Sequence, residues 1–529
     1  MARTLGEPVL TGTTDRQLVA IDDAPITGGD VVAIAFGAKV ELGSVARSRI
    51  AASRAVVDQL VAGETLIYGL NTGLGHMRNE RLPAEQLAAN QAFVIRSHAG
   101  GVGRPLPRAI VRAAMAVRLA GIARGGSGAS IDAADAYVDL LNAGITPVVP
   151  EIGSVGASDL APMAAIALVF MGEGRAELEG EVLAGGEALA RAGLVPVRLQ
   201  PKDGLTLVSA NGLSIGHAAL VVERATALVD AADAAVALSL EASLGNLSVV
   251  DPLVAAAKAV PGQARSAARI RGLLEDSGLC TGAPSVQDPL SFRVAPQVHG
   301  AFREVLATAA AAVDGELAAM DDNPLVVVDE GRMISTGNFH PMLLALALDA
   351  LRPAMAHVAQ LSDRRSGHIW DALVSDPAVV TAAGMARMGV APLVRYSIAA
   401  RAAELRTLAG PASLDVGPLD LGVEDHATNA PTVVRRTDEA LDVLADVLAG
   451  ELMVAAASLA YRAPDPTLLG LGTRRILGLV RAASAGREPD APVAEAHAAV
   501  RDLLEGPLAA SVETICGPSA TPPSEGARA

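Results

Sequence analysis

Five short segments of this 529-residue chain carry side chains that can do chemistry, and three of them combine these side chains with glycines. The first runs from Tyr68 to Gly75 and carries glycines at positions 69, 73 and 75. Glycine tolerates positive φ, so the segment is predicted to be a tight, mobile loop that presents the Tyr68 phenol. A phenol acts as a base only where nearby positive charge lowers its pKa from about 10. A lone Tyr is more often buried and bonded to backbone, but the loop glycines around Tyr68 favour a functional role.

Two further segments carry side chains that suit the binding of a small polar molecule. Arg293 ends the segment Gln287–Arg293, and its planar guanidinium can bind a carboxylate through two parallel hydrogen bonds. A buried Arg that pairs helices is the competing interpretation. His98 lies in Ser97–Gly103 and can hydrogen-bond a polar side chain of a substrate, although a lone His is more often structural. A fourth segment is Glu424-Asp425-His426.

The fifth segment, Gly153–Pro162, follows the stiff stretch Ile145–Pro150 and reads Gly-Ser-Val-Gly-Ala-Ser-Asp-Leu-Ala-Pro. This string resembles the prosthetic-group loop of the histidine and aromatic amino-acid ammonia-lyase family. Ser97-His98 and Glu424 make the chain most similar to the histidine enzymes of that family. In that family an Ala-Ser-Gly triad cyclises and loses water to give 4-methylideneimidazol-5-one, abbreviated MIO, which is the reactive electrophile. Here Asp159 follows Ala157-Ser158 directly, so the family glycine is absent.

The resemblance recurs in chain order through the other segments and through Gly337–His340. It implies that Tyr68 removes the substrate's β-proton and that Arg293 holds the substrate carboxylate. It implies that Glu424 pairs with an imidazole or helps to handle the leaving amine. The resemblance also implies that the electrophile is built from Ala157, Ser158 and Asp159. The substrate pocket is implied to be lined by His98, Ser209, Asn211, Gln287, Leu290 and Phe339.

Two departures from the family pattern bear on the electrophile. Ring closure requires the amide nitrogen of Asp159 to attack the Ala157 carbonyl carbon, a compression that glycine would allow. Asp159 also precedes an apolar helical pattern, where its side chain is expected to cap the helix. In an ungapped alignment Ser209 takes the place of the family asparagine that bonds the prosthetic carbonyl. Asn211 follows two residues later, which is the opposite face of a continuous helix.

The function that follows from the resemblance is non-oxidative elimination of ammonia from histidine or a related amino acid, giving an α,β-unsaturated acid. One alternative is a 2,3-aminomutase of the same family, which returns ammonia to the β-carbon. Another is a catalytically silent oligomer with the lyase fold, in which Ser158 stays a serine. The resemblance further implies a homotetramer in which each active site draws on three chains.

Long helices are predicted to position these segments. The chain is 51% hydrophobic but only 2% aromatic, so Ala, Val and Leu must form an interior that suits closely packed helices. Apolar residues keep helical spacing over 212–245, 294–320, 340–362, 390–409 and 430–460, which are much longer than the mean helix of about 11–12 residues. A mainly α fold follows, and the resemblance implies a long-helix bundle of the fumarase/aspartase-like type, with a small mixed N-terminal region.

Before residue 204 the pattern is more mixed. Residues 1–40 are predicted to form small strands and turns, with helices over 44–62, 85–96 and 108–123. Ser44 is the expected cap of the first helix, and Gly125 is expected to end the third. A β-excursion over 176–200 is predicted to turn at Gly185-Gly186. The expected domains are 1–203 and 204–516, followed by a disordered tail over 517–529.

Composition excludes several other classes of function. A net charge of −16 argues against nucleic acid or an anionic membrane surface as the main partner. Cys280 and Cys516 are the only cysteines, which suits a reducing compartment and gives no thiolate metal site. No metal-ligand spacing and no nucleotide-binding loop occurs, so neither a metal nor a nucleotide is expected. With no signal peptide visible and the longest apolar runs broken by charge, we expect a cytoplasmic protein without a membrane span.

Overall fold

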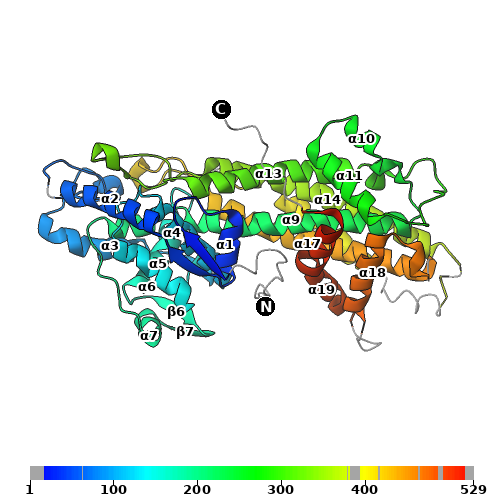
Figure 1. Cartoon of the computed structure of the whole chain (residues 1–529), viewed down its shortest axis with the longest axis horizontal. Helices are drawn as coiled ribbons and strands as arrows, with labels where there is room; N and C mark the ends of the chain where they lie inside the picture. Colours follow the sequence, from blue (N-terminus) through cyan, green and yellow to red (C-terminus); the bar gives the residue numbers. More distant parts are fainter. Residues whose placement is uncertain are drawn as a thin grey trace.

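The predicted long apolar segments form helices that lie side by side along the length of the molecule (Figure 1). The protein is represented by a computed structural model that describes residues 17–61, 63–377, 379–381, 394–414, 417–462, 465–485 and 492–518. Helix α9 packs against α17, α13 and α4, while α14 packs against α17, α13 and α16. The helices of the bundle are α9 Gly212–Ala242, α11 Pro261–Leu273, α13 Ala295–Ala318, α14 Met342–Val374, α16 Val394–Leu408, α17 Ala430–Arg462, α18 Leu471–Ser484, α19 Val493–Leu503 and α20 Ala509–Cys516, with the short α10 Pro252–Ala256 and α12 Leu290–Arg293 at one end.

A mixed region of shorter helices and small sheets covers the other end of the bundle (Figure 1). Its helices are α1 Gly28–Ala35, α2 Ser44–Val61, α3 Leu87–His98, α4 Arg108–Ala123, α5 Ile131–Ala143, α6 Leu160–Phe170, α7 Gly185–Arg191 and α8 Asp203–Val208. In its first sheet β1 Leu18–Ile21 pairs in parallel with β2 Lys39–Leu42. In the second sheet β3 Val102–Pro105 pairs antiparallel with β5 Pro150–Ile152. The third sheet is antiparallel and has the strand order β4-β6-β7, with β4 Thr146–Pro147, β6 Arg175–Leu178 and β7 Glu181–Ala184. A last hairpin joins β8 Leu325–Val327 to β9 Arg332–Ile334.

The mainly α fold and its long helices are as predicted, because helical periodicity of apolar residues is a local signal. Three local predictions are wrong. Helix α1 interrupts the predicted strands of the N-terminal region. The β6–β7 hairpin turns at Glu179-Gly180, which both have positive φ, and Gly185 instead opens α7.

The third error concerns the cap of α2. The carboxylate Oδ1 of Asp22 accepts the backbone N–H groups of Val45 and Ala46, at 2.8 and 3.0 Å. Asp22, and not Ser44, therefore supplies the acceptor that satisfies the free amides at the start of α2.

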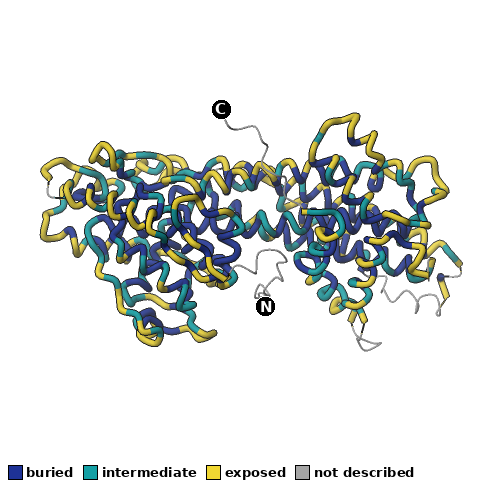
Figure 2. Tube along the Cα trace, viewed as in Figure 1, coloured by how far each residue is buried: buried dark blue, intermediate teal, exposed yellow. Residues whose placement is uncertain are grey.

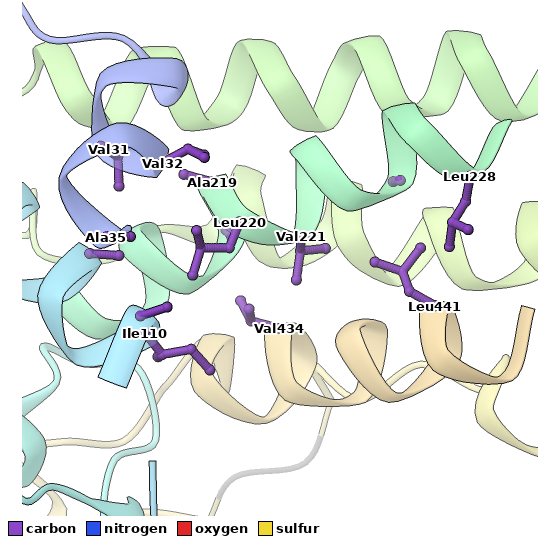
Figure 3. Close-up of a cluster of buried hydrophobic side chains, with 14 of the residues drawn as sticks. Val31, Val32, Ala35, Ile110, Ala219, Leu220, Val221, Leu228, Val434 and Leu441 are labelled. Carbon is purple, nitrogen blue, oxygen red and sulfur yellow. The ribbon is translucent and has the colours of Figure 1, made fainter. Parts of the chain in front are cut away.

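The core runs through the bundle and into the mixed region without a break. Helix α9 is buried along nearly its whole length (Figure 2), and its buried charged residues, such as Arg224 and Asp233, form ion pairs with other helices. Figure 3 shows Val31 and Ala35 of α1 and Ile110 of α4 on one side of α9, with Val434 of α17 close by. The division into domains 1–203 and 204–516 stays a prediction, and residues 1–16 and most of the tail, 519–529, lie outside the described residues.

Three stretches of the described helices, Asp203–Ala242, Met342–Val374 and Ala430–Arg462, are long and apolar enough to cross a membrane by length and composition alone. This corrects the prediction that charge interrupts every such stretch. In the folded chain 94%, 61% and 83% of their apolar windows are buried inside the protein. Most of their apolar surface is therefore packed against other helices.

Candidate active site

The Tyr68 loop is tightly folded and holds its phenol half-buried. Gly69 and Gly75 have φ of +67° and +56°, the conformation for which glycines were predicted. The Gly75 N–H donates to Tyr68 Oη at 3.4 Å. Burial is the largest cause of a raised Tyr68 pKa, and the charges of Glu424 and Asp420 raise it further. The Gly75 amide and Arg78 lower this pKa, but they do not outweigh the burial and the two carboxylates.

His98 and Glu424 lie close to this loop. His98 ends α3, and its Nδ1 lies 2.7 Å from the carbonyl oxygen of Val94 one turn earlier. This contact assigns the proton to Nδ1 and leaves Nε2 as the acceptor. The pKa of Glu424 is raised by burial and by Asp420, and is lowered by His98. Tyr68, His98 and Glu424, which are far apart in the sequence, thus share one electrostatic environment.

The loop that carries Ala157, Ser158 and Asp159 is buried at the N-terminal end of the bundle. The exposed fractions of these residues are 9%, 5% and 0%. Ser158 has a φ of +59°, which is unusual for a residue with a side chain, and it bridges to Gly156 across a sharp turn. Its N–H donates to the carbonyl oxygen of Phe339 at 3.3 Å.

Asp159 does not act as the predicted helix cap. It occupies the N-cap position of α6, but its side chain accepts no hydrogen bond from that helix. Instead Oδ2 accepts the Ser214 N–H at 2.7 Å, and Oδ1 accepts the hydroxyls of Ser214 and Ser154 at 3.0 and 2.9 Å. Burial raises the pKa of this carboxyl to about 6. The backbone N–H of Asp159 donates to the carbonyl oxygen of Ala210 at 2.7 Å.

Ser209 and Asn211 are not on opposite faces of one helix, because the helix is interrupted there. Helix α8 ends at Val208, and α9 begins at Gly212. Ser209 Oγ lies 3.4 Å from Ser158 Oγ. Asn211 is 1% exposed, and both polar atoms of its side-chain amide lack a hydrogen-bond partner among the described residues. Such an orphaned buried amide is costly unless another group binds it.

One segment, residues 424–429, joins the Tyr68 loop to the Ser158 loop. Glu424 lies at its start, and at its end the Asn429 N–H donates to the Val155 carbonyl oxygen at 2.7 Å. Between them, the Thr428 hydroxyl donates to the Gly156 carbonyl oxygen at 3.0 Å. The segment 424–429 therefore connects the two groups of predicted site residues.

Sequence reasoning missed several residues of this site. His340 Nε2 lies 2.8 Å from His426 Nδ1, which ties the residue after Phe339 to the segment 424–429. Both histidines stand inside recognised segments, so that signal was present. Ser154 also stands inside a recognised segment, whereas Ser214 gave no such signal, because its role depends on contact with Asp159.

The remaining predicted residues lie at the opposite end of the bundle. Asp288, next to Gln287, accepts the Asn246 N–H at 2.6 Å just beyond the C-terminal end of α9. Ser209 and Asn211 precede the N-terminal end of α9, which has 31 residues. At 1.5 Å per residue the two ends are about 45 Å apart. One chain therefore does not bring Gln287, Leu290 and Arg293 to Tyr68.

Buried charge holds this distant segment in place. Arg365 and Glu451 form an ion pair with both side chains fully buried, in which the N–O distances are 2.6 and 2.9 Å. Arg365 also donates to the Ser291 carbonyl oxygen at 2.9 Å. Asp363, two residues before Arg365, forms a further ion pair with Arg395. Leu290, in contrast, is 62% exposed.

Comparison with known proteins shows the family of this chain. The family model described as aromatic amino acid lyase matches residues 26–482. The histidine ammonia-lyase of Gloeobacter violaceus is 38% identical over 507 residues, which cover 94% of this chain and 98% of that protein.

Two solved structures show the same fold. Histidine ammonia-lyase from Trypanosoma cruzi superposes with a TM-score of 0.84 at 29% identity and covers 94% of this chain and 95% of its own. Tyrosine aminomutase from Streptomyces globisporus gives 0.85 at 27% identity, with coverage of 94% and 98%. These matches confirm the predicted fold class and a carbon–nitrogen lyase of the ammonia-lyase type, and the chain belongs to the aromatic amino acid lyase family.

Proposed function

We propose that this protein eliminates ammonia from histidine or a related amino acid with a polar side chain. The proposal rests on the electrostatic environment that Tyr68, His98 and Glu424 share, and on the segment 424–429, which hydrogen-bonds to the loop that carries Ala157–Asp159. In the reaction the β-C–H and α-C–N bonds break and a carbon–carbon double bond forms. The products are ammonia and an α,β-unsaturated acid.

The MIO group would be formed from Ala157, Ser158 and Asp159, and three observations support this fit. The turn at Ser158 already has the left-handed backbone of a compressed loop. The Asp159 carboxylate is held by Ser154 and Ser214 and does not cap α6. A capping role of this side chain therefore does not compete with ring closure at the backbone nitrogen of Asp159. The orphaned amide of Asn211, or the Ser209 hydroxyl near Ser158, could bind a carbonyl oxygen there. When formed, the group supplies an electrophile for the substrate's α-amine.

Tyr68 would take the β-proton on Oη. It must be deprotonated to do so, yet burial and two carboxylates raise its pKa within one chain. The charge that lowers it must therefore come largely from outside this chain's own loop. Arg293 of another subunit, carrying the substrate carboxylate, is the cation that we propose.

His98 and Glu424 would bind the substrate side chain. His98 Nε2 accepts a hydrogen bond, since Nδ1 is committed to Val94. Glu424 offers a carboxylate to an imidazole N–H. Both groups suit a donor such as histidine better than an apolar side chain, and Phe339 would line the same pocket.

A homotetramer would complete the site, because the Arg293 segment of one chain lies about 45 Å along α9 from its own Tyr68. Gln287 and Leu290 would then enter the pocket with Arg293. The free cysteines Cys280 and Cys516 support a cytoplasmic location.

The first experiment is the accurate mass of the peptide spanning Ala157-Ser158-Asp159, from protein expressed from a sequence-verified gene. The loss of two waters within this peptide, together with urocanate formation from histidine, is expected. An unmodified peptide would contradict the lyase mechanism and would favour a silent lyase-fold oligomer. A modified peptide with a β-amino acid as the product would identify a 2,3-aminomutase.

A further inference from the structure

We propose that His76 and Asp420 form a latch that holds the Tyr68 loop against the turn carrying Glu424. Both would be positioning residues, since neither is assigned to the substrate. Their effect on catalysis rests on the proposed function, whereas the latch itself is a property of the fold.

The latch joins two segments that are 344 residues apart in the sequence. Asp420 Oδ2 accepts the backbone N–H of His76 at 2.8 Å. Asp420 Oδ1 lies 2.6 Å from His76 Nδ1, the distance of a strong hydrogen bond from a ring N–H to a carboxylate. One carboxylate thus binds both the backbone and the side chain of the same residue.

The latch is directly coupled to the phenol. His76 follows Gly75, whose N–H donates to Tyr68 Oη. Two consecutive amides of one turn, Gly75–Met77, therefore point to Tyr68 and to Asp420 respectively. Movement of Asp420 would displace the hydrogen-bond donor of the phenol.

The turn that carries Asp420 has an unfavourable backbone conformation. Asp420, Leu421 and Gly422 have φ of +46°, +56° and +82°, although two of them are not glycine. The turn is closed by Leu419 and Glu424, whose backbones exchange hydrogen bonds of 2.7 and 3.3 Å. The same closed turn therefore sets Asp420 and Glu424, and such strain persists only where surrounding contacts enforce it.

Close approach also explains the residue at position 75. A Cβ on Gly75 would collide with the Asp420 carboxylate, and the φ of this residue is positive as well. Glycine is therefore required there by the latch and not only by the turn.

The latch is suited to positioning rather than to overall stability. The side chains of His76 and Asp420 are 51% and 27% exposed. Exposed ion pairs contribute little to the free energy of unfolding. Their removal should therefore change the local motion of the loop while the fold survives.

The test uses the full-length protein and the variants D420A, H76A, D420A/H76A and D420N. Asp135 provides a matched control, because the Arg47–Asp135 pair is similarly exposed, at 43% and 37%, and lies on other elements. Backbone hydrogen exchange of peptides covering residues 66–82 is the main measurement. We expect D420A and H76A to speed this exchange by roughly two- to five-fold, with D135A unchanged.

The two single changes should be non-additive in exchange, because they break one contact. If the chain is active, kcat should fall in D420A with KM nearly constant, and D420N, which still accepts from the His76 amide, should recover part of it. Unchanged exchange in D420A and H76A would overturn the latch. Faster exchange with unchanged kcat would overturn the positioning role.

Failure of the proposed function gives a different pattern. An unmodified Ala157–Asp159 peptide and an inactive wild type would refute the lyase mechanism. The hydrogen exchange of the Tyr68 loop would still decide for or against the latch, because it does not depend on turnover.

Discussion

Tyr68 depends on charges that the rest of the molecule controls. Its pKa is raised by burial first, and then by the carboxylates of Glu424 and Asp420. A phenol with a raised pKa is mostly protonated near neutral pH and cannot accept a proton. Glu424 is therefore proposed to help bind the substrate, while its charge and that of Asp420 are unfavourable for the base.

Glu424→Gln removes one of these charges, so the pKa of Tyr68 should fall. The rise of kcat/KM with pH that reports deprotonation of the base should then move to lower pH, even though the absolute rate decreases through lost substrate binding. The measurement is the pH profile of kcat/KM. Glu80→Gln, an exposed change near the same loop, is the control, and an upward shift in Glu424→Gln would contradict the assigned role.

The ionisation of Glu316 on α13 is expected to make the free energy of unfolding depend on pH. Burial, and then Asp321, raise its pKa from 4.5 to about 7. Because the folded-state value lies above the unfolded one, its contribution is fully present below pH 4.5 and is lost as the pH rises through about 7.

Glu316→Gln cannot ionise and should be the more stable protein at pH 8, by on the order of 1 kcal/mol, after allowing for the partial exposure of this side chain. At pH 4.5 the two proteins should have nearly the same melting temperature. Thermal melts at both pH values test this, with Asp314→Asn, an exposed change on the same helix, as the control. Equal melting temperatures at pH 8 would contradict it.

At the scale of elements, the Ser158 loop is shaped by contact with residues 428–430. Gly156 has a φ of +83°, and a Cβ there would meet the Thr428 hydroxyl and would lie 2.8 Å from the Ala430 nitrogen. Gly180, in the β6–β7 turn, has a φ of +82° but nothing within 4 Å of a built Cβ. The two glycines therefore separate the cost of backbone conformation from the cost of collision.

We expect Gly180→Ala to lower the free energy of unfolding by about 1–2 kcal/mol and to leave the chemistry intact. Gly156→Ala should cost more and should also displace the loop, so that the Ala157–Asp159 peptide stays unmodified. Denaturant unfolding and peptide mass measure the two effects. A fully modified Gly156→Ala peptide would show that the loop tolerates the displacement.

At the scale of the whole molecule, the length of the bundle bears on the proposed site, which needs both Tyr68 and Arg293. Helix α9 keeps the Arg293 segment and Tyr68 at opposite ends of a straight, buried bundle (Figure 1). Bending such a bundle would break its close packing. Under the proposed function, another copy of the chain must therefore supply the Arg293 that acts beside this Tyr68.

Mixed tetramers test this directly. Tyr68→Phe and Arg293→Met should each be nearly inactive, with losses of roughly 10²-fold or more. Their co-expression should restore activity at about a quarter of the sites, because random assembly pairs an intact Tyr68 with an intact Arg293 of another chain. No recovery in mixed tetramers would place both residues in the site of a single chain.

The sequence by itself determined what depends on neighbouring residues. The five long helices follow from apolar spacing, and Gly69 and Gly75 have the positive φ expected of loop glycines. The family follows from short segments in a fixed order. Each of these signals is local, so no knowledge of distant contacts is needed to read it.

Only the tertiary structure decided which distant partner each polar side chain takes. Asp22 caps α2, Asp159 turns from its own helix to Ser214, and Asp420 binds His76. A carboxylate accepts from any donor within reach, and the packing of elements far apart in the sequence determines which donor that is. The resemblance assigns Arg293 and Tyr68 to one active site, whereas the packing of the bundle places them at opposite ends of each chain.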